Sequence, residues 1–214
     1  MATLRALLSG SRWLEQASLL GRALRSTPRS VGGLLVVGTP GFEPWHMTAH
    51  LDNESRLSGL AELSPTLVRW SPPPDAPPHL SVGLARLEAA RRGETLFVVA
   101  EETAPVPLLE RVSDARKTGA TILALDSDDP ELDALAHEAL AVPGTLSFDA
   151  GQHLVSAAAG EGAGPGSGRA SAGRSSASQG SAGQGRTGRG SASQGNSLRA
   201  RLGRLLDNVA GPSS

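Results

Sequence analysis

The chain of 214 residues has no cysteine, and its 20 basic and 21 acidic residues give a formal net charge of −1. The lack of cysteine excludes a disulfide framework, a thiolate metal site and a cysteine nucleophile. The charge is unevenly distributed, with a net +4 in residues 1–30, −11 in residues 31–161 and +6 in residues 162–214. An acidic body with basic ends indicates either a polyanion-binding tail or a tail that folds back on its own body.

Residues 1–30 begin with an amphipathic helical pattern. Its apolar face consists of Trp13, Ala17, Leu20 and Leu24. This spacing predicts an N-terminal helix that packs on the following domain. Because the segment carries arginine and almost no acid, a targeting peptide and a helix at a membrane interface remain alternatives. No apolar run approaches the roughly 20 residues of a membrane-spanning helix, and we expect a cytoplasmic protein.

Residues 31–159 alternate short apolar runs with helical patterns, which is typical of an α/β domain. The predicted strands are residues 33–38, 66–70, 96–100, 120–125 and, at an edge, 145–148. The predicted helices are residues 44–63, 80–92, 106–117, 130–140 and 152–159. Continuous apolar runs are expected of parallel strands that are buried on both faces. We therefore predict a three-layer α/β/α sandwich with a mainly parallel five-stranded sheet.

One stretch has the pattern of a right-handed βαβ crossover. An apolar run at 96–100 is followed by the loop Glu101-Glu102-Thr103, a helix, the helix stop Gly119 and a second apolar run. The stretch reads VVAEETAPVPLLERVSDARKTGATILALDS over residues 98–127.

This stretch resembles the SIS (sugar isomerase) family of phosphosugar-binding domains. In that family a strand ends in a Ser-x-Ser-Gly-Glu-Thr-like loop, followed by a helix and a Gly-Ala-x-x-Ile-Ala-Leu strand. Glu102-Thr103 and residues 119–125 match this pattern, and the resemblance extends over roughly residues 30–150. Ala100 replaces the family's phosphate-binding serine, and Glu101 replaces its glycine. The chain therefore resembles a degenerate member of the family.

The resemblance implies where a ligand would bind. Residues matching the family's two phosphate loops are Gly38, Thr39, Gly41 and Thr103. In a sugar-phosphate isomerase, Glu102 or His50 would act as the base for enediol chemistry. The resemblance also implies self-association as a dimer.

Two other patterns contain residues that can bind a metal ion. His46 and His50 are four residues apart, which is a ligand spacing on a helix, but no third ligand lies nearby in the sequence. Asp126, Asp128 and Asp129 could bind Mg²⁺, but we favour an acidic turn that caps a helix. We therefore predict neither a metal nor a cofactor.

The last quarter of the chain differs in composition. Residues 160–196 contain no leucine, isoleucine, valine, phenylalanine, methionine or tryptophan, which predicts a disordered linker. Residues 197–210 predict a short basic amphipathic helix. Its apolar, partner-binding face consists of Leu198, Leu202, Leu205, Leu206 and Val209. Docking of this helix, on a groove of a partner protein or on an anionic membrane, is favoured over its return to the domain and over fraying.

Two main functional hypotheses follow. The first is a non-catalytic SIS-like domain that acts as an interaction or regulatory module with a tethered docking helix. The second is a protein that binds a sugar phosphate, or a sugar-phosphate isomerase. A weaker hypothesis is a nonspecific nucleic-acid contact through the arginine-rich tail.

Overall fold

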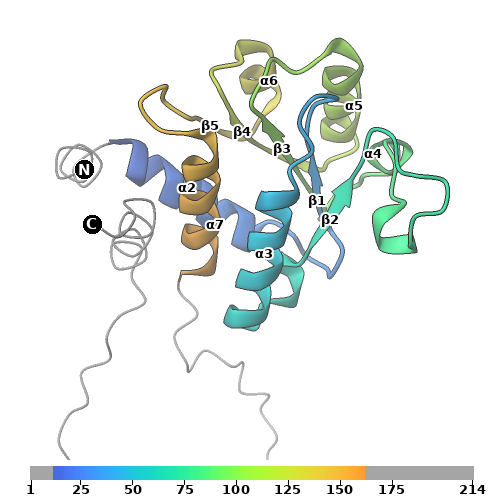
Figure 1. The fold of residues 1–214 in the computed structure, drawn as a ribbon, viewed down its shortest axis with the longest axis horizontal. Helices are drawn as coiled ribbons and strands as arrows, with labels where there is room; N and C mark the ends of the chain where they lie inside the picture. The colour runs from blue at the N-terminus through green and yellow to red at the C-terminus, as the bar shows by residue number, and fades with distance from the viewer. Residues whose placement is uncertain (1–11, 162–214) are drawn as a thin grey trace, which may run out of the picture.

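A computed structural model describes residues 12–161 (Figure 1). Its strands are β1 (Leu34–Val37), β2 (Pro65–Val68), β3 (Thr95–Ala100), β4 (Thr121–Asp126) and β5 (Glu138–Ala141). They form one sheet in the order β2-β1-β3-β4-β5, and every neighbouring pair is parallel. The predicted α/β class with a five-stranded sheet is confirmed. Because the strand order reverses between β1 and β3, the loops that follow these two strands lie at a topological switch point.

Helices cover both faces of the sheet. The helices α2 (Arg12–Ser26), α3 (Trp45–Ser58) and α7 (Phe148–Gly160) cover one face, and α4 (Ala85–Glu88), α5 (Val106–Lys117) and α6 (Pro130–Leu135) cover the other (Figure 1). Two short 3-10 turns, Ala61–Leu63 and Pro78–Leu80, flank β2. None of the helices in residues 12–161 is long and apolar enough to cross a membrane. The predicted linker 160–196, for all but its first two residues, and the predicted helix 197–210 lie outside the described residues.

Alternating residues of each central strand enter two separate cores. Phe97 and Val99 pack with the helices on the α2 face, whereas Leu96 and Val98 pack with those on the α5 face. All four side chains are fully buried. This arrangement explains why the sequence of β3 is apolar throughout, because both faces of a covered parallel sheet lie in a core.

Helix α2 contributes to one of these cores. Its apolar residues Ala17, Leu20 and Leu24 are buried, and the indole N–H of Trp13 donates a hydrogen bond of 2.7 Å to the carbonyl oxygen of Ala141 in β5. Gly21 faces Ala158 of α7. The helix is thus attached both to the sheet edge and to α7.

The predicted helix 80–92 is wrong in extent, because only Ala85–Glu88 is α-helical. The chain before α4 pairs with the end of β2 instead: the amide of Arg69 donates to the carbonyl oxygen of Val82 at 2.8 Å, and Arg69 forms a parallel bridge with Gly83. This pairing holds the chain extended where the leucine spacing predicted a helix.

The last strand is also misplaced in the prediction. The predicted helix 130–140 ends at Leu135, and residues 138–141 form β5. The amide of His137 donates a hydrogen bond of 2.8 Å to the carbonyl oxygen of Ile122, and the amide of Ile122 donates one of 2.9 Å to Nδ1 of His137. These two bonds hold the chain alongside β4. The predicted edge strand 145–148 is instead a turn leading into α7, with Ser147 as its N-cap.

Candidate functional site

The loop after β1 contains three of the predicted ligand-binding residues, and it folds tightly on itself. A Cβ atom at Gly38 would overlap the carbonyl oxygen of Phe42, and the amide of Phe42 donates to the carbonyl oxygen of Thr39 at 3.2 Å. Thr39 is only 1% exposed, and its hydroxyl oxygen is buried without a hydrogen-bond partner. The indole of Trp70 donates to the carbonyl oxygen of Gly38 at 2.8 Å. The Thr39 hydroxyl therefore faces the protein interior.

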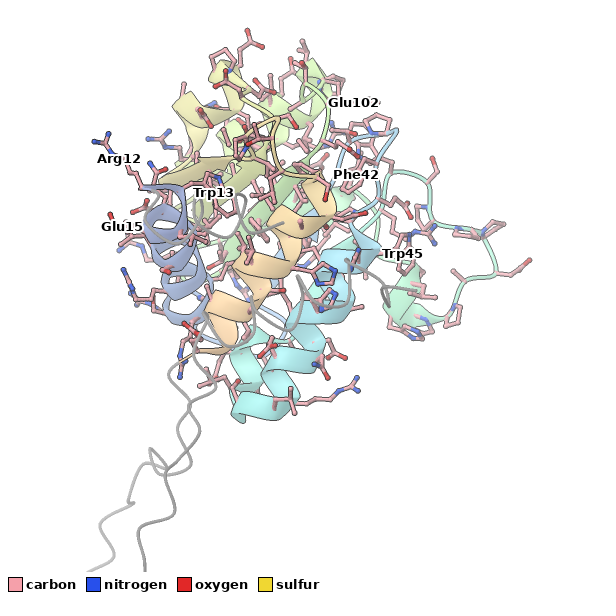
Figure 2. The ribbon with its side chains drawn as sticks, turned by 60° about the vertical axis from the view of Figure 1, so that its left-hand side comes forward. Arg12, Trp13, Glu15, Phe42, Trp45 and Glu102 are labelled. Atoms are coloured by element: carbon pink, nitrogen blue, oxygen red, sulfur yellow. The ribbon has the colours of Figure 1, made fainter. Side chains whose placement is uncertain are left out.

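The loop after β3 meets this first loop. A Cβ atom at Gly41 would lie 3.3 Å from a carboxylate oxygen of Glu102. Glu101, Glu102 and Thr103 are all exposed. Figure 2 shows Glu102 and Phe42 on the same side of the molecule. The fold thus brings together Gly41 and Glu102, two of the predicted site residues.

A cluster of charged and aromatic side chains, which includes Arg69 directly after β2, stabilises the first loop. Glu43 accepts a hydrogen bond of 2.7 Å from the indole of Trp45 and forms an ion pair of 3.0 Å with Arg69. The guanidinium of Arg69 also lies 4.9 Å from the ring centroid of Trp45. Because Arg69 is held by a carboxylate and an aromatic ring, its charge is already compensated within the protein.

The acidic turn after β4 is largely structural. Asp126 is fully buried and accepts amide hydrogen bonds from Asp128 at 2.8 Å and Asp129 at 3.2 Å. Asp129 caps α6 and accepts a hydrogen bond of 2.7 Å from the amide of Ala104. Two of the three carboxylates that could have bound Mg²⁺ are therefore bound to backbone amides, in agreement with the favoured capping interpretation.

Burial raises the pKa of Asp126 to about 6. The two amide hydrogen bonds oppose this shift, while the carboxylate of Asp133 adds to it. The protonated form is stabilised relative to that of an ordinary aspartate, because a negative charge in a desolvated position beside the Asp133 carboxylate is costly. Asp126 therefore has a pKa of about 6, although it lies inside the turn.

His50 is a residue of α3, and its ring lies in a group of three histidines where α3 meets α7. Its ring centroid is 4.7 Å from that of His46 and 4.2 Å from that of His153, and the centroids of His46 and His153 are 4.4 Å apart. One ring nitrogen of each lies within 4.8 Å of the others. Sequence reasoning found the pair on α3 but missed His153, because the 103 positions that separate it from His50 leave no spacing signal.

His50 and His153 favour their neutral forms. Burial, followed by the charges of His153 and His46, lowers the pKa of His50 to about 4. Burial and His46 also lower the pKa of His153, while Asp149 opposes this shift. Nδ1 of His46 lies 3.5 Å from a carboxylate oxygen of Asp149. Neutral imidazole nitrogens can act as general bases or as metal ligands.

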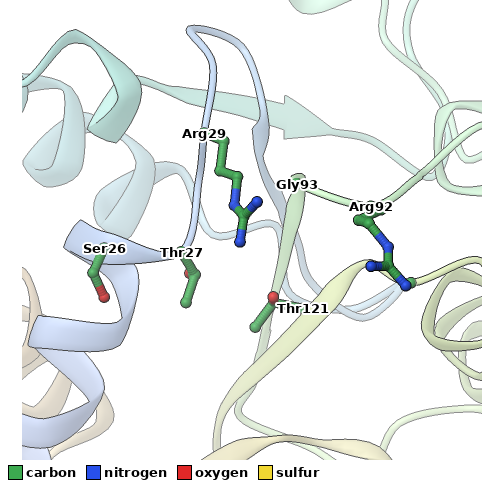
Figure 3. A pocket seen from close by; sticks show the side chains of 7 residues that line it. Ser26, Thr27, Arg29, Arg92, Gly93 and Thr121 are labelled. Atoms are coloured by element: carbon green, nitrogen blue, oxygen red, sulfur yellow. The ribbon is translucent and has the colours of Figure 1, made fainter.

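A cavity of about 300 Å³ lies at the opposite, amino edge of the sheet (Figure 3). Its lining consists of Ser26, Thr27, Arg29, Arg92, Gly93, Gly119 and Thr121. Arg29 and Arg92 extend into the space shown in Figure 3. Two guanidinium groups and several hydroxyl groups therefore surround this cavity, in contrast to the carboxylates of Glu101 and Glu102 at the carboxyl edge.

Comparisons with known proteins give structural matches only. No family model matches the sequence, and no curated protein matches it. A Silicibacter pomeroyi DSS-3 protein, provisionally described as a phosphosugar isomerase, is similar in structure with a TM-score of 0.49 and 15% identity, over 72% of this chain and 44% of that one.

Two Salmonella typhimurium LT2 proteins are also similar. One, provisionally described as a sugar-binding protein, gives a TM-score of 0.46 and 16% identity over 74% of this chain and 46% of its own. The other, provisionally described as a phosphosugar isomerase, gives a TM-score of 0.41 and 12% identity over 71% of this chain and 45% of its own. This chain spans less than half the length of each of these three proteins.

Proposed function

We propose that residues 31–159 form a non-catalytic SIS-like domain that acts as an interaction or regulatory module. The observation that carries this proposal is the burial of the Thr39 hydroxyl, which belongs to one of the two loops that the resemblance implies for a phosphate. In the loop after β3, Ala100 replaces the family's phosphate-binding serine and Glu101 replaces its glycine. A site for a phosphate dianion needs donors that point at the ligand, and here one donor faces inward while an acceptor occupies the loop.

Electrostatics add to this argument. Two unit charges 4 Å apart near a protein surface interact by about 4 kcal/mol, so a phosphate dianion beside Glu101, which replaces the family's glycine, would be strongly repelled. Glu101 is exposed, and residues 31–161 carry a net charge of −11. Arg69 does not offset this charge, because Glu43 holds it at 3.0 Å.

The partner side of the proposal rests on the sequence. Residues 197–210 would dock on a partner protein through the face formed by Leu198, Leu202, Leu205, Leu206 and Val209. Self-association as a dimer and a cytoplasmic location remain predictions. The full chain should capture a partner protein, and a chain that lacks residues 197–214 should not. The two proteins should have the same melting temperature.

The direct test is thermal melting of the full chain with a panel of sugar phosphates at millimolar concentration. We expect no shift for the unmodified chain. The variant with Ala100→Ser and Glu101→Gly should gain a shift of several degrees if the loop has only lost its phosphate donors, because a ligand at 100 times its Kd adds about 2.7 kcal/mol. A clear shift of the unmodified chain that Glu102→Gln abolishes would contradict the proposal.

A phosphosugar-binding protein or isomerase is the second candidate. It is favoured by one observation: Gly41 and Glu102 meet at the switch point, where ligands of open α/β sheets bind. In that case Thr103→Ala should weaken binding, and Glu102→Gln should abolish isomerisation. Binding that is lost in Arg92→Ala but kept in Thr103→Ala would place the ligand in the cavity at the amino edge instead.

A further inference from the structure

The seam between α3 and α7 gathers metal-ligand side chains from distant parts of the chain. The two helices run side by side in parallel, since Phe42 contacts Phe148 at one end and Glu54 lies against Gly160 at the other. His46 and His50 are one helical turn apart on α3 and therefore share a face. His153 projects from the second turn of α7 against both of them.

The geometry is close to that of a three-histidine metal site. One ring nitrogen of each histidine lies within 4.8 Å of the other two. Nitrogens bound to one tetrahedral Zn²⁺ at 2.0–2.1 Å are about 3.3 Å apart. The three side chains are only half-buried, so small rotations can close this difference of about 1.5 Å or less. Partial exposure also leaves a path by which an ion can enter.

Asp149 lies in the position of a supporting carboxylate. Its oxygen is 3.5 Å from Nδ1 of His46 and accepts a hydrogen bond of 3.1 Å from the amide group of Gln152. Histidines that bind a metal commonly donate their second nitrogen to such a carboxylate, which orients the ring. With Nδ1 of His46 turned toward Asp149, its Nε2 atom remains available to bind a metal ion.

We propose that His46, His50 and His153 bind one Zn²⁺ ion through three imidazole nitrogens, with the fourth position open to water or to a donor atom of a ligand. Imidazole suits zinc and its neighbours rather than Mg²⁺ or Ca²⁺, which prefer oxygen ligands. The ion would join α3, which begins at the end of the first loop, to α7. This inference is independent of the function proposed for the carboxyl edge.

The test is calorimetric titration of the full, untagged and chelator-treated chain with Zn²⁺, together with thermal melting. We expect one ion per chain and a melting temperature raised by several degrees under excess Zn²⁺. Mg²⁺ and Ca²⁺ should produce no shift. Co²⁺ should bind competitively and give the visible absorption of a four-coordinate ion.

Matched variants make the test decisive. His50→Gln and His153→Gln should each weaken Zn²⁺ binding by more than about 100-fold, and Asp149→Asn by about 10- to 100-fold, as expected for a residue outside the metal's own ligands. His79→Gln is the control, because His79 is exposed on a distant turn. Circular dichroism should show each variant folded. Unchanged affinity in both His50→Gln and His153→Gln, or equal loss in His79→Gln, would overturn the proposal.

Discussion

At the scale of single residues, Gly21 shows how close packing can require a residue that the helix itself disfavours. A Cβ atom here would lie 2.5 Å from Cβ of Ala158 and 2.8 Å from the backbone nitrogen of Ala159. Glycine in a helix interior costs about 1 kcal/mol relative to alanine. The close approach of α2 to α7 offsets that cost.

We therefore predict that Gly21→Ala destabilises the protein although it improves helix propensity. Overpacking against the backbone of α7 should lower the free energy of unfolding by about 1–3 kcal/mol. Urea denaturation would measure the change. Gly144→Ala is the matched control, because nothing lies within 4 Å of a Cβ atom at Gly144. Equal stability of the two variants would show that α2 and α7 are not packed this closely.

Asp126 makes folding depend on pH in a predictable direction. Its pKa is raised from 3.8 to about 6 in the folded protein. The folded state therefore binds more protons than the unfolded state between about pH 4 and 6, and this contribution to stability is lost as the pH rises through that window. Asp126→Asn removes the titration and retains an acceptor for the amides of Asp128 and Asp129.

The measurement is the free energy of unfolding of both proteins at several pH values. The difference between wild type and Asp126→Asn should fall from pH 4 to 6 and become constant above about pH 7. Taking the difference between the two free energies of unfolding cancels the contributions of the histidines, which are common to both proteins. A difference that stays level or rises over this range would contradict the raised pKa.

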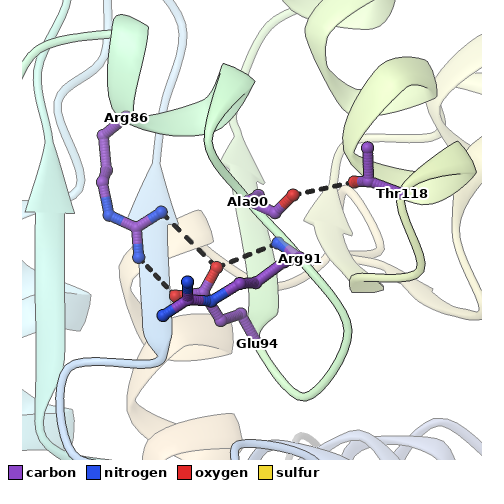
Figure 4. Close-up of polar contacts among 5 residues, drawn as sticks. All are labelled: Arg86, Ala90, Arg91, Glu94 and Thr118. Atoms are coloured by element: carbon purple, nitrogen blue, oxygen red, sulfur yellow. Dashed lines mark hydrogen bonds and ion pairs between the residues drawn. The ribbon is translucent and has the colours of Figure 1, made fainter.

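At the scale of elements, the turn between α4 and β3 depends on one buried carboxylate (Figure 4). Glu94 accepts hydrogen bonds from the guanidinium of Arg86 at 2.5 Å and from the amide of Arg91 at 3.0 Å. The hydroxyl of Thr118 donates to the carbonyl oxygen of Ala90 at 2.8 Å, which attaches the same turn to the end of α5. These contacts replace the helical hydrogen bonds that the longer predicted helix would have made.

Glu94→Ala should lower the free energy of unfolding by about 1–3 kcal/mol, because it leaves the Arg86 guanidinium and the Arg91 amide without their acceptor. Guanidinium denaturation can measure this loss. The comparison is Lys117→Ala, which removes an exposed ion pair of 2.9 Å with Asp114 and should cost no more than about 1 kcal/mol. If both variants lose the same small amount, Glu94 does not hold the turn.

At the scale of the whole molecule, the packing of α2 bears on whether residues 1–30 contain a core helix or a removable targeting segment. Leu20 and Leu24 lie in the same core as Phe97 of the central strand. Burying a leucine contributes about 1.5–3 kcal/mol. Loss of the helix would therefore expose part of one face of the sheet and the side of α7 that packs on α2.

A chain that lacks residues 1–27 should not melt cooperatively and should bind a hydrophobic dye. A chain that lacks residues 1–11 retains α2 and serves as the control. Calorimetry of the two truncated proteins would measure the difference. Cooperative melting of the shorter chain at an unchanged temperature would instead favour the targeting interpretation.

The sequence alone determined the centre of the fold. The helix predicted at 106–117 coincides with α5, and the strands on either side were predicted to within one residue. These elements are readable because a strand buried on both faces must be apolar throughout, and because Gly119 takes a positive φ of 96° where the helix ends.

Only the tertiary structure decided the rest. The residues Glu-Ala-Leu-Ala of β5 suit a helix by local preference, and pairing with β4 makes them a strand. The carboxylate of Glu102 reaches Gly41, and His153 reaches His46 and His50, only because parallel layers bring distant segments together. Such contacts have no local signal, since they depend on how elements pack and not on the spacing of residues along the chain.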